Sequence, residues 1–290
     1  MADYKSFPRP GPESGHLGLA SGVIMSSVVI TGAAGNLGTK LSSHFAQLGC
    51  NLTLLDMRPR GRPDIIEADL CEPGGSWTQH IHAANVVIHL AGATWPYQDW
   101  SDLQRSNIDA LINVLNCCVD DRAPRRLVFA SSLLTMDGYR NSTDIISPDM
   151  PARPTTFYAV TKLAGERLCL DATRRGPLDV VCLRLGATRR GANAPTSKVG
   201  LWEQQRWLSN GDFCRAIERA AFAQTRGFAL ALIASRNQGM RWSLEEARSL
   251  IGYEPADASV PKNPPVRHRL SRFARDHILT VWPGLQTHVH

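Results

Sequence analysis

One stretch near the start of the chain limits the possible folds more than any other. The letters SSVVITG (residues 26–32) form a β-branched apolar run that ends in glycine, and NLGTKLSSHFAQLG (36–49) follows with apolar residues at helical spacing. Gly32, Gly35 and Gly38 give the pattern G-x-x-G-x-x-G. Such glycines let the backbone turn tightly and approach a pyrophosphate, which the amides of the helix N-terminus stabilise. We therefore predict a strand–loop–helix unit that binds a dinucleotide.

Strands and helices continue to alternate as far as residue 186. We predict further strands over 51–56, 63–70, 84–92, 125–132 and 179–186, and further helices over 103–120 and 155–174. The run over 84–92 is almost wholly apolar, as expected of a strand that is covered on both faces. This alternation predicts an α/β fold, in which a doubly wound parallel sheet carries helices on both faces.

The pattern changes after Gly186. Residues 187–200 are loop-like, and a helix, a strand and a second helix are predicted over 211–224, 227–235 and 243–253. The second helix has Ser243 as its N-cap and Glu246 completing a capping box. The predicted parts are a flexible leader (1–25), a nucleotide-binding domain (26–186), a small substrate-binding portion (187–265) and a basic tail (266–290).

Composition and charge exclude several classes of partner. The 290 residues carry a formal charge of +6, yet we find no basic stripe with interleaved aromatics and no known nucleic-acid module. No run is long and apolar enough to cross a membrane, and the leader lacks the charged start and apolar core of a signal peptide. We therefore predict no nucleic-acid partner and no membrane partner.

The cysteines indicate a reducing compartment. There are seven, no C-x-x-C occurs, and most of them lie in apolar surroundings. Free thiols of this kind are typical of a cytoplasmic protein, and not of a disulfide framework or a zinc site. His80, His82 and His89 have no further metal ligands beside them, so no metal site is predicted.

Acidic residues end the second and third predicted strands. Asp56 ends the second strand, where a carboxylate can accept hydrogen bonds from both hydroxyls of an adenosine ribose. The same charge repels a 2′-phosphate, which favours NAD over NADP, although three arginines that follow closely leave NADP open. Asp69 and Leu70 end the third strand and are predicted to flank the adenine.

The letters TTFYAVTKLAG (155–165) place Tyr158 four residues before Lys162. In a helix these two side chains lie one turn apart on one face. The pair suits proton transfer, because a nearby ammonium stabilises a phenolate and lowers the pKa of tyrosine from its usual value near 10. Alone, the pattern is also compatible with an ordinary helix that carries one aromatic residue.

The glycine loop, the letters FASS at the end of the fifth strand and the Tyr158–Lys162 pair occur together. In this order they resemble the extended, epimerase-like branch of the short-chain dehydrogenase/reductase superfamily, and the resemblance covers residues 26–186. It implies a Rossmann-type fold and an NAD-dependent enzyme. Tyr158 would take the proton of a substrate hydroxyl while hydride leaves for NAD⁺, Lys162 would also hold the nicotinamide ribose, and Ser132 would orient the reacting oxygen.

The resemblance also implies the remaining cofactor contacts. Asn107 matches an asparagine that supports the cofactor side of the structure in this branch; the alternative is an amide on a helix surface. The residues implied to bind NAD are Gly32, Gly35, Asn36, Leu37, Gly38, Asp56, Asp69, Leu70, Leu90, Ala91, Gly92, Asn107, Tyr158, Lys162 and Leu185.

Within this branch the chain is most similar to uronate dehydrogenases, which oxidise the anomeric carbon of galacturonate or glucuronate with NAD⁺. Stretches such as VVITGAAGNLG, IHLAGAT and SPDMPARPTTFYAVTKLAGE carry the similarity. Those enzymes have Asn-His after the catalytic serine, where Leu133 and Leu134 stand here, and a serine where Ala187 stands. The residues implied to face the substrate are Thr94, Ser132, Leu133, Leu134 and Ala187.

These departures change the predicted substrate pocket. Fewer hydrogen-bonding partners weaken discrimination for a polyhydroxylated sugar. The carboxylate-binding arginine of uronate dehydrogenases has no clear counterpart. Its candidates are Arg189, Arg190, Lys198 and Arg206. Trp95, Tyr97 and Trp100 are equally compatible with a pocket wall and with packing under a helix.

We therefore predict an NAD-dependent dehydrogenase that acts on a small molecule, namely a sugar, a sugar acid or a related alcohol. One alternative is a nucleotide-sugar epimerase or dehydratase, for which the C-terminal portion is short. Another is a non-catalytic NAD-binding regulator, which would not need Tyr158 and Lys162. A homo-oligomer is implied, because members of the branch usually pair through the helices that carry Asn107 and Tyr158.

Overall fold

The computed structural model describes residues 26–94, 98–119 and 125–263. The predicted flexible leader (1–25) and basic tail (266–290) lie outside the described residues, and so do Trp95 and Tyr97.

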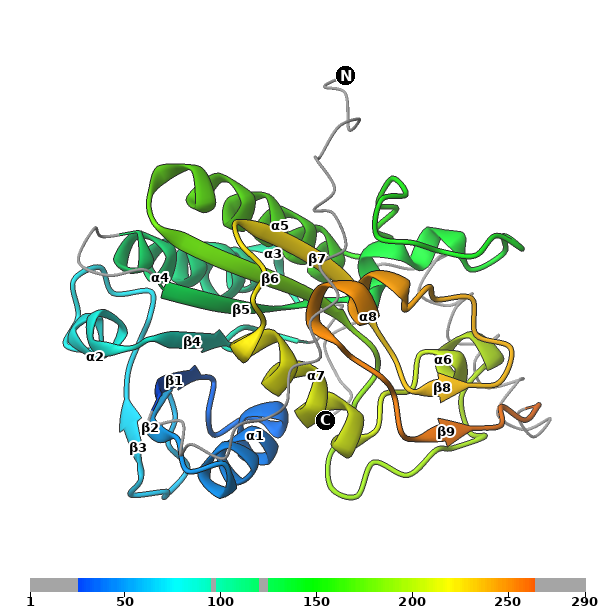
Figure 1. Ribbon diagram of the computed structural model, residues 1–290, viewed down its shortest axis with the longest axis horizontal. Coiled ribbons are helices and arrows are strands. Elements are labelled where there is room, and N and C mark those ends of the chain that lie inside the picture. Colours follow the sequence, from blue (N-terminus) through cyan, green and yellow to red (C-terminus); the bar gives the residue numbers. More distant parts are fainter. Residues whose placement is uncertain (1–25, 95–97, 120–124, 264–290) are drawn as a thin grey trace.

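Within the described residues, seven parallel strands form one sheet in the order β3-β2-β1-β4-β5-β6-β7 (Figure 1). The strands are β1 (Ser27–Thr31), β2 (Asn51–Asp56), β3 (Ile65–Glu67), β4 (Val86–His89), β5 (Arg125–Ser132), β6 (Leu178–Leu185) and β7 (Phe228–Ile233). Each falls where a strand was predicted, and β3 is much shorter than its prediction. The predicted α/β fold with a doubly wound parallel sheet is confirmed.

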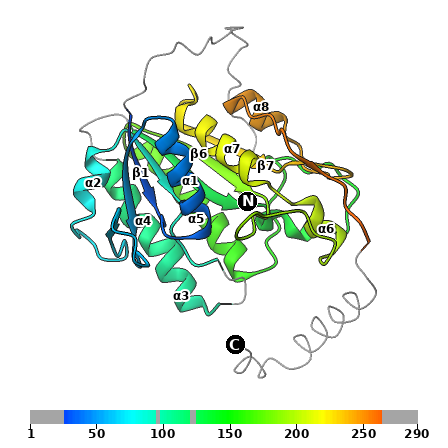
Figure 2. The same cartoon turned by 90° about the horizontal axis from the view of Figure 1, so that it is seen from below.

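Helices cover both faces of the sheet (Figures 1 and 2). One face carries α1 (Asn36–Gln47), α7 (Asn210–Phe222) and α8 (Glu245–Ile251), and the other carries α2 (Thr78–Ala83), α4 (Ala110–Cys118) and α5 (Phe157–Arg175). Val28 and Ile30 of β1 pack with the first group, and Val29 packs with the second. Side chains of a strand alternate between its faces, so a strand with two covered faces is apolar throughout.

The strand order reverses between β1 and β4. β1 pairs with β2 on one side and with β4 on the other. Loops that leave the carboxyl ends of strands at such a point diverge, and the crevice between them is where open α/β sheets bind ligands. The glycine loop follows β1, residues 90–92 follow β4, and Ser132 ends β5. The sheet therefore brings the predicted cofactor and catalytic residues to one edge.

The sheet continues beyond residue 186. β7, predicted as part of the C-terminal portion, pairs with β6 along its whole length. The remaining elements are α6 (Leu201–Gln205), β8 (Arg236–Asn237) and β9 (Ala258–Ser259), which lie at the right of Figure 1. The assignment of residues 187–265 to substrate binding stays a prediction, and the sheet does not end at its boundary.

Two predicted helices differ in detail. The helix predicted over 103–120 begins at Trp100 and consists of α3 (Trp100–Gln104), a π-helical turn η1 (Arg105–Asp109) and α4. The predicted capping box is wrong in its pairing: Ser243 Oγ accepts from the N–H of Glu245 (3.4 Å), and the N–H of Ser243 donates to the carbonyl of Ile146 (2.8 Å). A side-chain bond from Ser243 Oγ to Glu246 (3.1 Å) remains. The short 3₁₀ segment η2 (Leu133–Tyr139) was not predicted.

Candidate active site

Two close approaches explain the glycines between β1 and α1. Gly32 has a φ of +71°, and a Cβ there would lie 2.8 Å from the backbone nitrogen of Ala91. A Cβ at Gly38 would lie 2.3 Å from the carbonyl oxygen of Gly32. The first turn of α1 carries no acidic side chain. The amides of this turn and the positive end of the helix dipole therefore suit an anion, and the loop fits the pyrophosphate of a dinucleotide.

Asp56 is held in place by the same loop. One carboxylate oxygen, Oδ2, accepts from the N–H of Ala34 (2.9 Å), and Oδ1 accepts from the N–H of Arg58 (2.8 Å). Each oxygen can accept a further hydrogen bond. The carboxylate at the end of β2 is thus oriented next to the glycine loop, in an arrangement that fits a ribose diol.

Asp69 lies at the edge of an open cleft. Its carboxylate accepts from the N–H of Cys71 (2.9 Å) and from the guanidinium of Arg105 (2.7 Å). Both bonds lower the pKa of Asp69, the backbone bond more strongly. The cleft has a volume of about 510 Å³ and is lined by Asp69, Cys71, Glu72, Arg105 and Asp109. Leu70, the other predicted adenine neighbour, is buried.

Asn107 connects the loop after β4 to α5. Its Oδ1 accepts from the N–H of Ala93 (2.7 Å), and its Nδ2 donates to the carbonyl of Ala93 (3.1 Å) and to Thr161 Oγ1 (2.9 Å). The side chain is buried, so it is not an amide on a helix surface. It lies in the π-helical turn η1, a feature that is frequent at functional sites. Because Thr161 precedes Lys162, these bonds fix the loop after β4 relative to Lys162.

Ser132 and Tyr158 meet where β5 ends beside α5. The Oγ of Ser132 accepts from the N–H of Leu134 (3.2 Å) and shares a hydrogen bond with Tyr158. Thr156 caps α5 by accepting from the N–H of Ala159 (3.2 Å). This cap places Tyr158 in the first turn of the helix, next to the end of β5.

Lys162 lies one turn further along α5. Its Nζ is 5.8 Å from the centre of the Tyr158 ring and 5.1 Å from the centre of the Phe129 ring. Both Tyr158 and Lys162 are buried. The two side chains therefore lie on one side of the helix, as their spacing predicts.

Burial sets the proton affinity of both groups. It raises the pKa of Tyr158 to about 12, against the opposing effect of the bond with Ser132. Burial also lowers the pKa of Lys162 to about 8, against the opposing effects of Cys169 and Glu166. The expected fall in the tyrosine pKa is therefore not produced by the protein alone, because desolvation outweighs the hydrogen bond with Ser132. At neutral pH the pair is a neutral phenol beside a largely protonated lysine.

His89 is a buried neighbour of this pair. Its Nδ1 lies 3.0 Å from Thr31 Oγ1, and its ring stacks on Phe129 with 6.2 Å between the ring centres. Burial, followed by the charge of Lys162, lowers the pKa of His89 to about 3. The imidazole is therefore neutral at physiological pH and acts as a packing group.

A buried ion pair behind the catalytic residues was not predicted. Arg184 of β6 donates to Glu166 of α5 through Nε (2.9 Å) and Nη2 (2.8 Å), and Ser131 Oγ donates to the same carboxylate (2.5 Å). The pair joins β5, β6 and α5 next to Ser132 and Lys162. The available signal was a single arginine within the apolar run of β6 and a glutamate one turn after Lys162.

The residues predicted to face the substrate are not equivalent. Leu133 is fully buried in an apolar cluster with Trp202 and Trp242. Leu134 is partly exposed and Thr94 is exposed, so both side chains can meet a ligand. Ala187 is tied by its backbone to the segment at 206–208, through bonds of 2.7 and 3.0 Å. Of the two leucines, only Leu134 is open to a substrate.

The four candidate cations also differ. Arg189 is half-buried, whereas Arg190 and Lys198 are exposed. The carbonyl of Arg206 accepts from the N–H of Ala187 (2.7 Å).

Trp100, one of the three aromatic residues considered for a pocket wall, lies at the start of α3 and is 44% exposed.

Comparison with known proteins identifies the family. Residues 28–199, more than half of the chain, match the NAD dependent epimerase/dehydratase family. The chain belongs to this family.

The proteins to which the chain is similar include dehydrogenases of a sugar and of a sugar acid. An L-arabinose 1-dehydrogenase (NAD(P)(+)) from Haloferax volcanii is 29% identical over 81% of this chain and 98% of its own length. A uronate dehydrogenase from Pseudomonas putida is 27% identical over 80% of this chain and 84% of its own length. The crystal structure of uronate dehydrogenase from Agrobacterium tumefaciens has the same fold, with a TM-score of 0.67 and 23% identity over 91% of this chain and 92% of that one.

These findings confirm the predicted resemblance to the epimerase/dehydratase family and its likeness to uronate dehydrogenase. They also confirm the NAD cofactor and the class of NAD-dependent oxidoreductase. The roles of individual site residues remain predictions, which rest on the geometry above.

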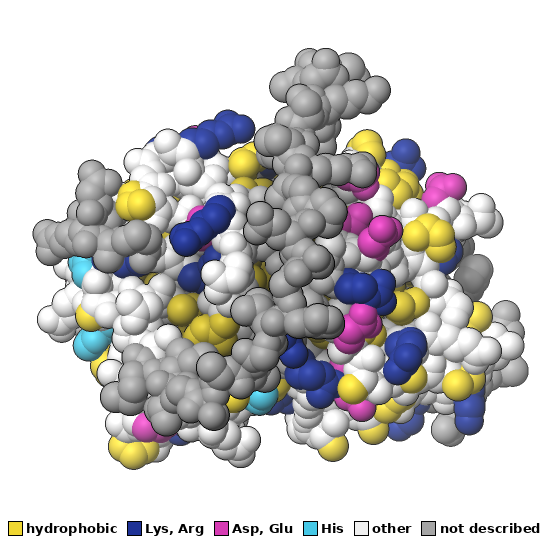
Figure 3. Space-filling model, viewed as in Figure 1, with side chains coloured by type: hydrophobic (Ala, Val, Ile, Leu, Met, Phe, Trp, Pro, Cys, Tyr) yellow, Lys and Arg dark blue, Asp and Glu magenta, His cyan; other side chains and the backbone are white. Residues whose placement is uncertain are grey.

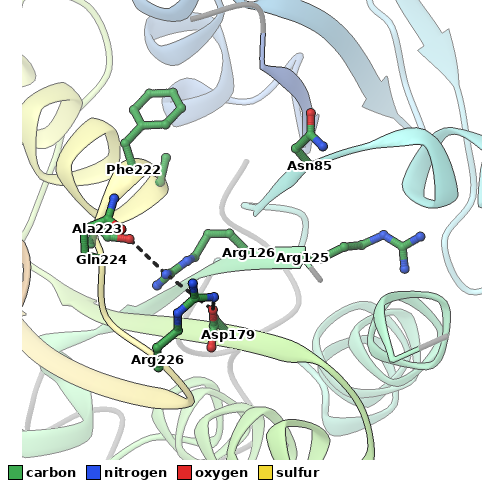
Figure 4. Close-up of a pocket in the computed structure, with 9 residues that line it drawn as sticks. Asn85, Arg125, Arg126, Asp179, Phe222, Ala223, Gln224 and Arg226 are labelled. Atoms are coloured by element: carbon green, nitrogen blue, oxygen red, sulfur yellow. Dashed lines mark hydrogen bonds and ion pairs between the residues drawn. The ribbon is translucent and has the colours of Figure 1, made fainter. Parts of the chain in front are cut away.

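A second cleft lies at the opposite end of the sheet from the glycine loop. It has a volume of about 380 Å³ and is lined by Asn85, Arg125, Arg126, Asp179, Ala221, Phe222, Ala223, Gln224 and Arg226. Figure 4 shows Arg126 and Arg226 directed at Asp179, and Arg125 directed away from it. The two ion pairs measure 3.8 and 3.1 Å. These residues stand at the amino ends of β4, β5 and β6, away from Ser132 and Tyr158.

The surface charge and the helices concern the predicted absence of nucleic-acid and membrane partners. On the face shown in Figure 3, Lys and Arg side chains lie among Asp and Glu side chains. In the three stretches that the structure describes, no helix has the length and apolar character of a membrane span.

Proposed function

We propose that the protein is a dehydrogenase that oxidises a hydroxyl-bearing carbon of a sugar or a related small molecule with NAD⁺. The observation that carries this proposal is the cluster of Ser132, Tyr158 and Lys162 at the carboxyl ends of the strands, beside the glycine loop. The activities of the two relatives, on L-arabinose and on uronates, support a sugar substrate.

Each residue of the cluster has a role that its surroundings support. Ser132 already accepts from Leu134 and shares a bond with Tyr158, so its hydroxyl can orient a substrate oxygen. Tyr158 receives the substrate hydroxyl proton as its phenolate. Lys162, with its pKa of about 8, is largely cationic at neutral pH and stabilises that phenolate. Bound NAD⁺ supplies the acceptor for the hydride that leaves the same carbon.

The phenolate needs more positive charge than Lys162 provides. In the protein alone the pKa of Tyr158 is about 12. Proton transfer therefore depends on the cationic cofactor being in place, because only a second positive charge offsets the burial of the phenolate. This dependence keeps the base inactive until the cofactor is bound.

The substrate is more apolar, or less hydroxylated, than a uronate. Leu134 and Ala187 replace a histidine and a serine of uronate dehydrogenases at positions implied to face the sugar. A pocket that hydrogen-bonds a hydroxyl group selects strongly for substrates that carry it. An apolar wall lacks this selectivity, so the pocket no longer favours a highly hydroxylated sugar acid. Neutral aldoses and simpler alcohols therefore rank ahead of galacturonate and glucuronate.

The test is NADH formation by the purified full chain with a panel of neutral aldoses, uronates, aldonates and secondary alcohols. We expect activity on the neutral members and its loss in Tyr158→Phe. Activity confined to uronates would overturn the substrate class while keeping the enzyme class. No NADH with any member, together with tight binding of NAD⁺, would favour a non-catalytic NAD-binding regulator.

We also propose a homo-oligomer in the cytoplasm. Trp100 and Phe157 are 44% and 61% exposed and contact each other edge to face at 5.9 Å, with Val160 (38% exposed) on the same helix as Phe157. Exposed aromatic side chains of this kind suit burial against a second copy. Light scattering should give a multiple of the chain mass, and Phe157→Ser should reduce the measured mass.

The seven free cysteines support a reducing compartment.

A further inference from the structure

Within the described residues, two cations next to the first turn of α1 have no acidic partner. Lys40 Nζ donates to Asn36 Oδ1 (2.8 Å) and to the backbone carbonyl of Arg189 (2.7 Å). The guanidinium of Arg189 is half-buried, and among the described residues it forms no hydrogen bond and no ion pair. Burial lowers the pKa of both groups; at Lys40 the thiol of Cys214 opposes this effect, and at neither group does a carboxylate of the described residues oppose it. The site therefore has positive charge that the described protein does not neutralise.

The segment that carries Arg189 is firmly attached. Asn36 Nδ2 donates to the carbonyl of Thr188 (3.0 Å), and the N–H of Arg189 donates to Asn193 Oδ1 (2.8 Å). Asn193 is buried, adopts a φ of +54°, and donates to the carbonyl of Leu208 (2.7 Å). A non-glycine residue with positive φ persists only where the surroundings hold it. The backbone of Arg189 is thus fixed to α1 on one side and to Asn193 on the other.

The attachment also changes the role of Asn36. Its side chain is used to hold Thr188 and Lys40, so only its backbone N–H is available to a cofactor. The first residues of α1 therefore serve two purposes. Their amides face the glycine loop, and their side chains hold the segment after β6 against the helix.

A half-buried guanidinium without a counter-charge is costly unless a ligand supplies the negative charge. The anion site next to Arg189 is the glycine loop with the start of α1, because Lys40 bonds both the carbonyl of Arg189 and Asn36, the first residue of that helix; the anion that fits this loop is the pyrophosphate of NAD. We propose that Arg189 is a cofactor-binding residue that forms a charged contact with the NAD pyrophosphate, and that Lys40 and Asn36 are positioning residues which hold it there. The carboxylate of an acidic substrate is the competing partner for Arg189.

The experiment measures binding and needs no substrate, so it stands whether or not the proposed reaction is correct. Titration calorimetry with the full chain compares NAD⁺, ADP-ribose and adenosine, of which only the first two contain the pyrophosphate. For Arg189→Gln we expect the Kd of NAD⁺ and of ADP-ribose to rise roughly 10- to 100-fold, as for the loss of a hydrogen bond between charged groups. The Kd of adenosine should stay within about twofold of the wild type, since no contact to the nucleoside is removed.

The neighbouring Arg190 offers a matched control. It is exposed and carries the same charge, so Arg190→Gln should leave all three Kd values within about twofold. Arg189→Lys should retain part of the affinity, because a lysine keeps the charge but loses the fork of donors. Added salt should weaken NAD⁺ binding more in the wild type than in Arg189→Gln.

Three results would overturn the assignment. The first is an unchanged Kd of NAD⁺ in Arg189→Gln, with only the KM for an acidic substrate affected, which would give Arg189 to the substrate. The second is an equal loss in the Arg190 variant, which would indicate general surface charge. The third is an equal loss of adenosine binding, which would indicate damage to the fold of the site, and thermal melting of each variant checks this independently.

Discussion

The two ends of the sheet hold buried cations in opposite states. At the amino ends, Arg126 donates to the carbonyls of Ala223 and Thr225 and lies 3.8 Å from Asp179. At the carboxyl ends, Lys162 forms no ion pair within the described residues, and burial takes its pKa to about 8. The guanidinium of Arg126 has its partners within the protein. The ammonium of Lys162 has no anionic partner among the described residues, so it is available to a ligand. Burial of a charge does not mark a functional site in this fold, whereas a buried charge without a partner does.

The same contrast separates two tyrosines. Tyr253 is buried and donates to the carbonyl of Ala234 (3.0 Å), so its hydroxyl serves the packing of α8 on β7. Tyr158 is also buried, but its hydroxyl is hydrogen-bonded to Ser132 at the candidate active site. Removing groups at the two ends of the sheet should therefore separate loss of activity from loss of stability.

The largest expected effect is the loss of the phenol at the carboxyl end. Tyr158→Phe should lower kcat by about 10²- to 10⁴-fold, the usual contribution of a general acid or base. The Kd of NAD⁺ should change little. The matched control, Tyr253→Phe, should keep kcat and lose about 1 kcal/mol of unfolding free energy. Steady-state kinetics and urea unfolding measure both, and a similar kcat loss in the two variants would remove the distinction between them.

A smaller effect is expected at the ribose site. Asp56→Asn should raise the Kd of NAD⁺ roughly 10- to 100-fold and should reduce the preference for NAD⁺ over NADP⁺, because the repelling charge is gone. Asp64 is the control, since its side chain is 54% exposed and pairs with Arg62 near β3. Asp64→Asn should leave both cofactor affinities unchanged. A preference for NADP⁺ in the wild type would contradict the assignment of Asp56.

At the amino end the expected effect is on stability alone. Arg126→Met should lower the unfolding free energy by about 2 kcal/mol, because the carbonyls of Ala223 and Thr225 lose their donor. The kcat/KM should not change. Arg226→Met is the control: its side chain is 80% exposed, and its ion pair with Asp179 should contribute less than about 0.5 kcal/mol. A large fall in kcat/KM for Arg126→Met would mean that the two ends are coupled.

The smallest effect concerns His89 and acid. Its pKa is lowered to about 3 in the native protein. Between this value and the unfolded pKa, the unfolded state binds a proton and the native state does not. The stability that this group contributes is present above its unfolded pKa of about 6.5 and is lost as the pH falls toward 3. Between pH 7.5 and 5.5 the wild type should lose about 1.4 kcal/mol more unfolding free energy than His89→Gln. Urea unfolding at the two pH values tests this, and equal losses would show that His89 titrates in the native protein.

The region from β1 to α1 was predictable because its sequence pattern is short and continuous along the chain. A largely apolar run is needed for a strand covered on both faces. The glycine spacing reflects one close backbone approach within the loop and one to Ala91, after β4. The helical spacing of Tyr158 and Lys162 also predicted their placement on one side of α5. For these features, the spacing of residues along the chain was sufficient to predict where they lie in the fold.

The features that sequence reasoning missed depend on contacts between distant segments. Leu133 was expected to face the substrate, but the 3₁₀ segment after β5 turns it into an apolar cluster with Trp202 and Trp242. The Arg184–Glu166 pair joins a strand to a helix and has no spacing rule. The direction of the Tyr158 pKa shift depends on its burial, which the motif does not give.

The π-helical turn Arg105–Asp109 has a consequence for changes in chain length. Each residue of an α-helix advances about 100° around the axis, so one added residue rotates everything after it by that amount. This rotation lets Asn107 reach Ala93 and Thr161 while Leu111 and Val114 of α4 remain buried against the sheet. Deleting a single residue here would turn the apolar side of α4 away from the sheet. The segment therefore accepts substitutions more readily than deletions, and relatives that share this architecture should differ in length elsewhere.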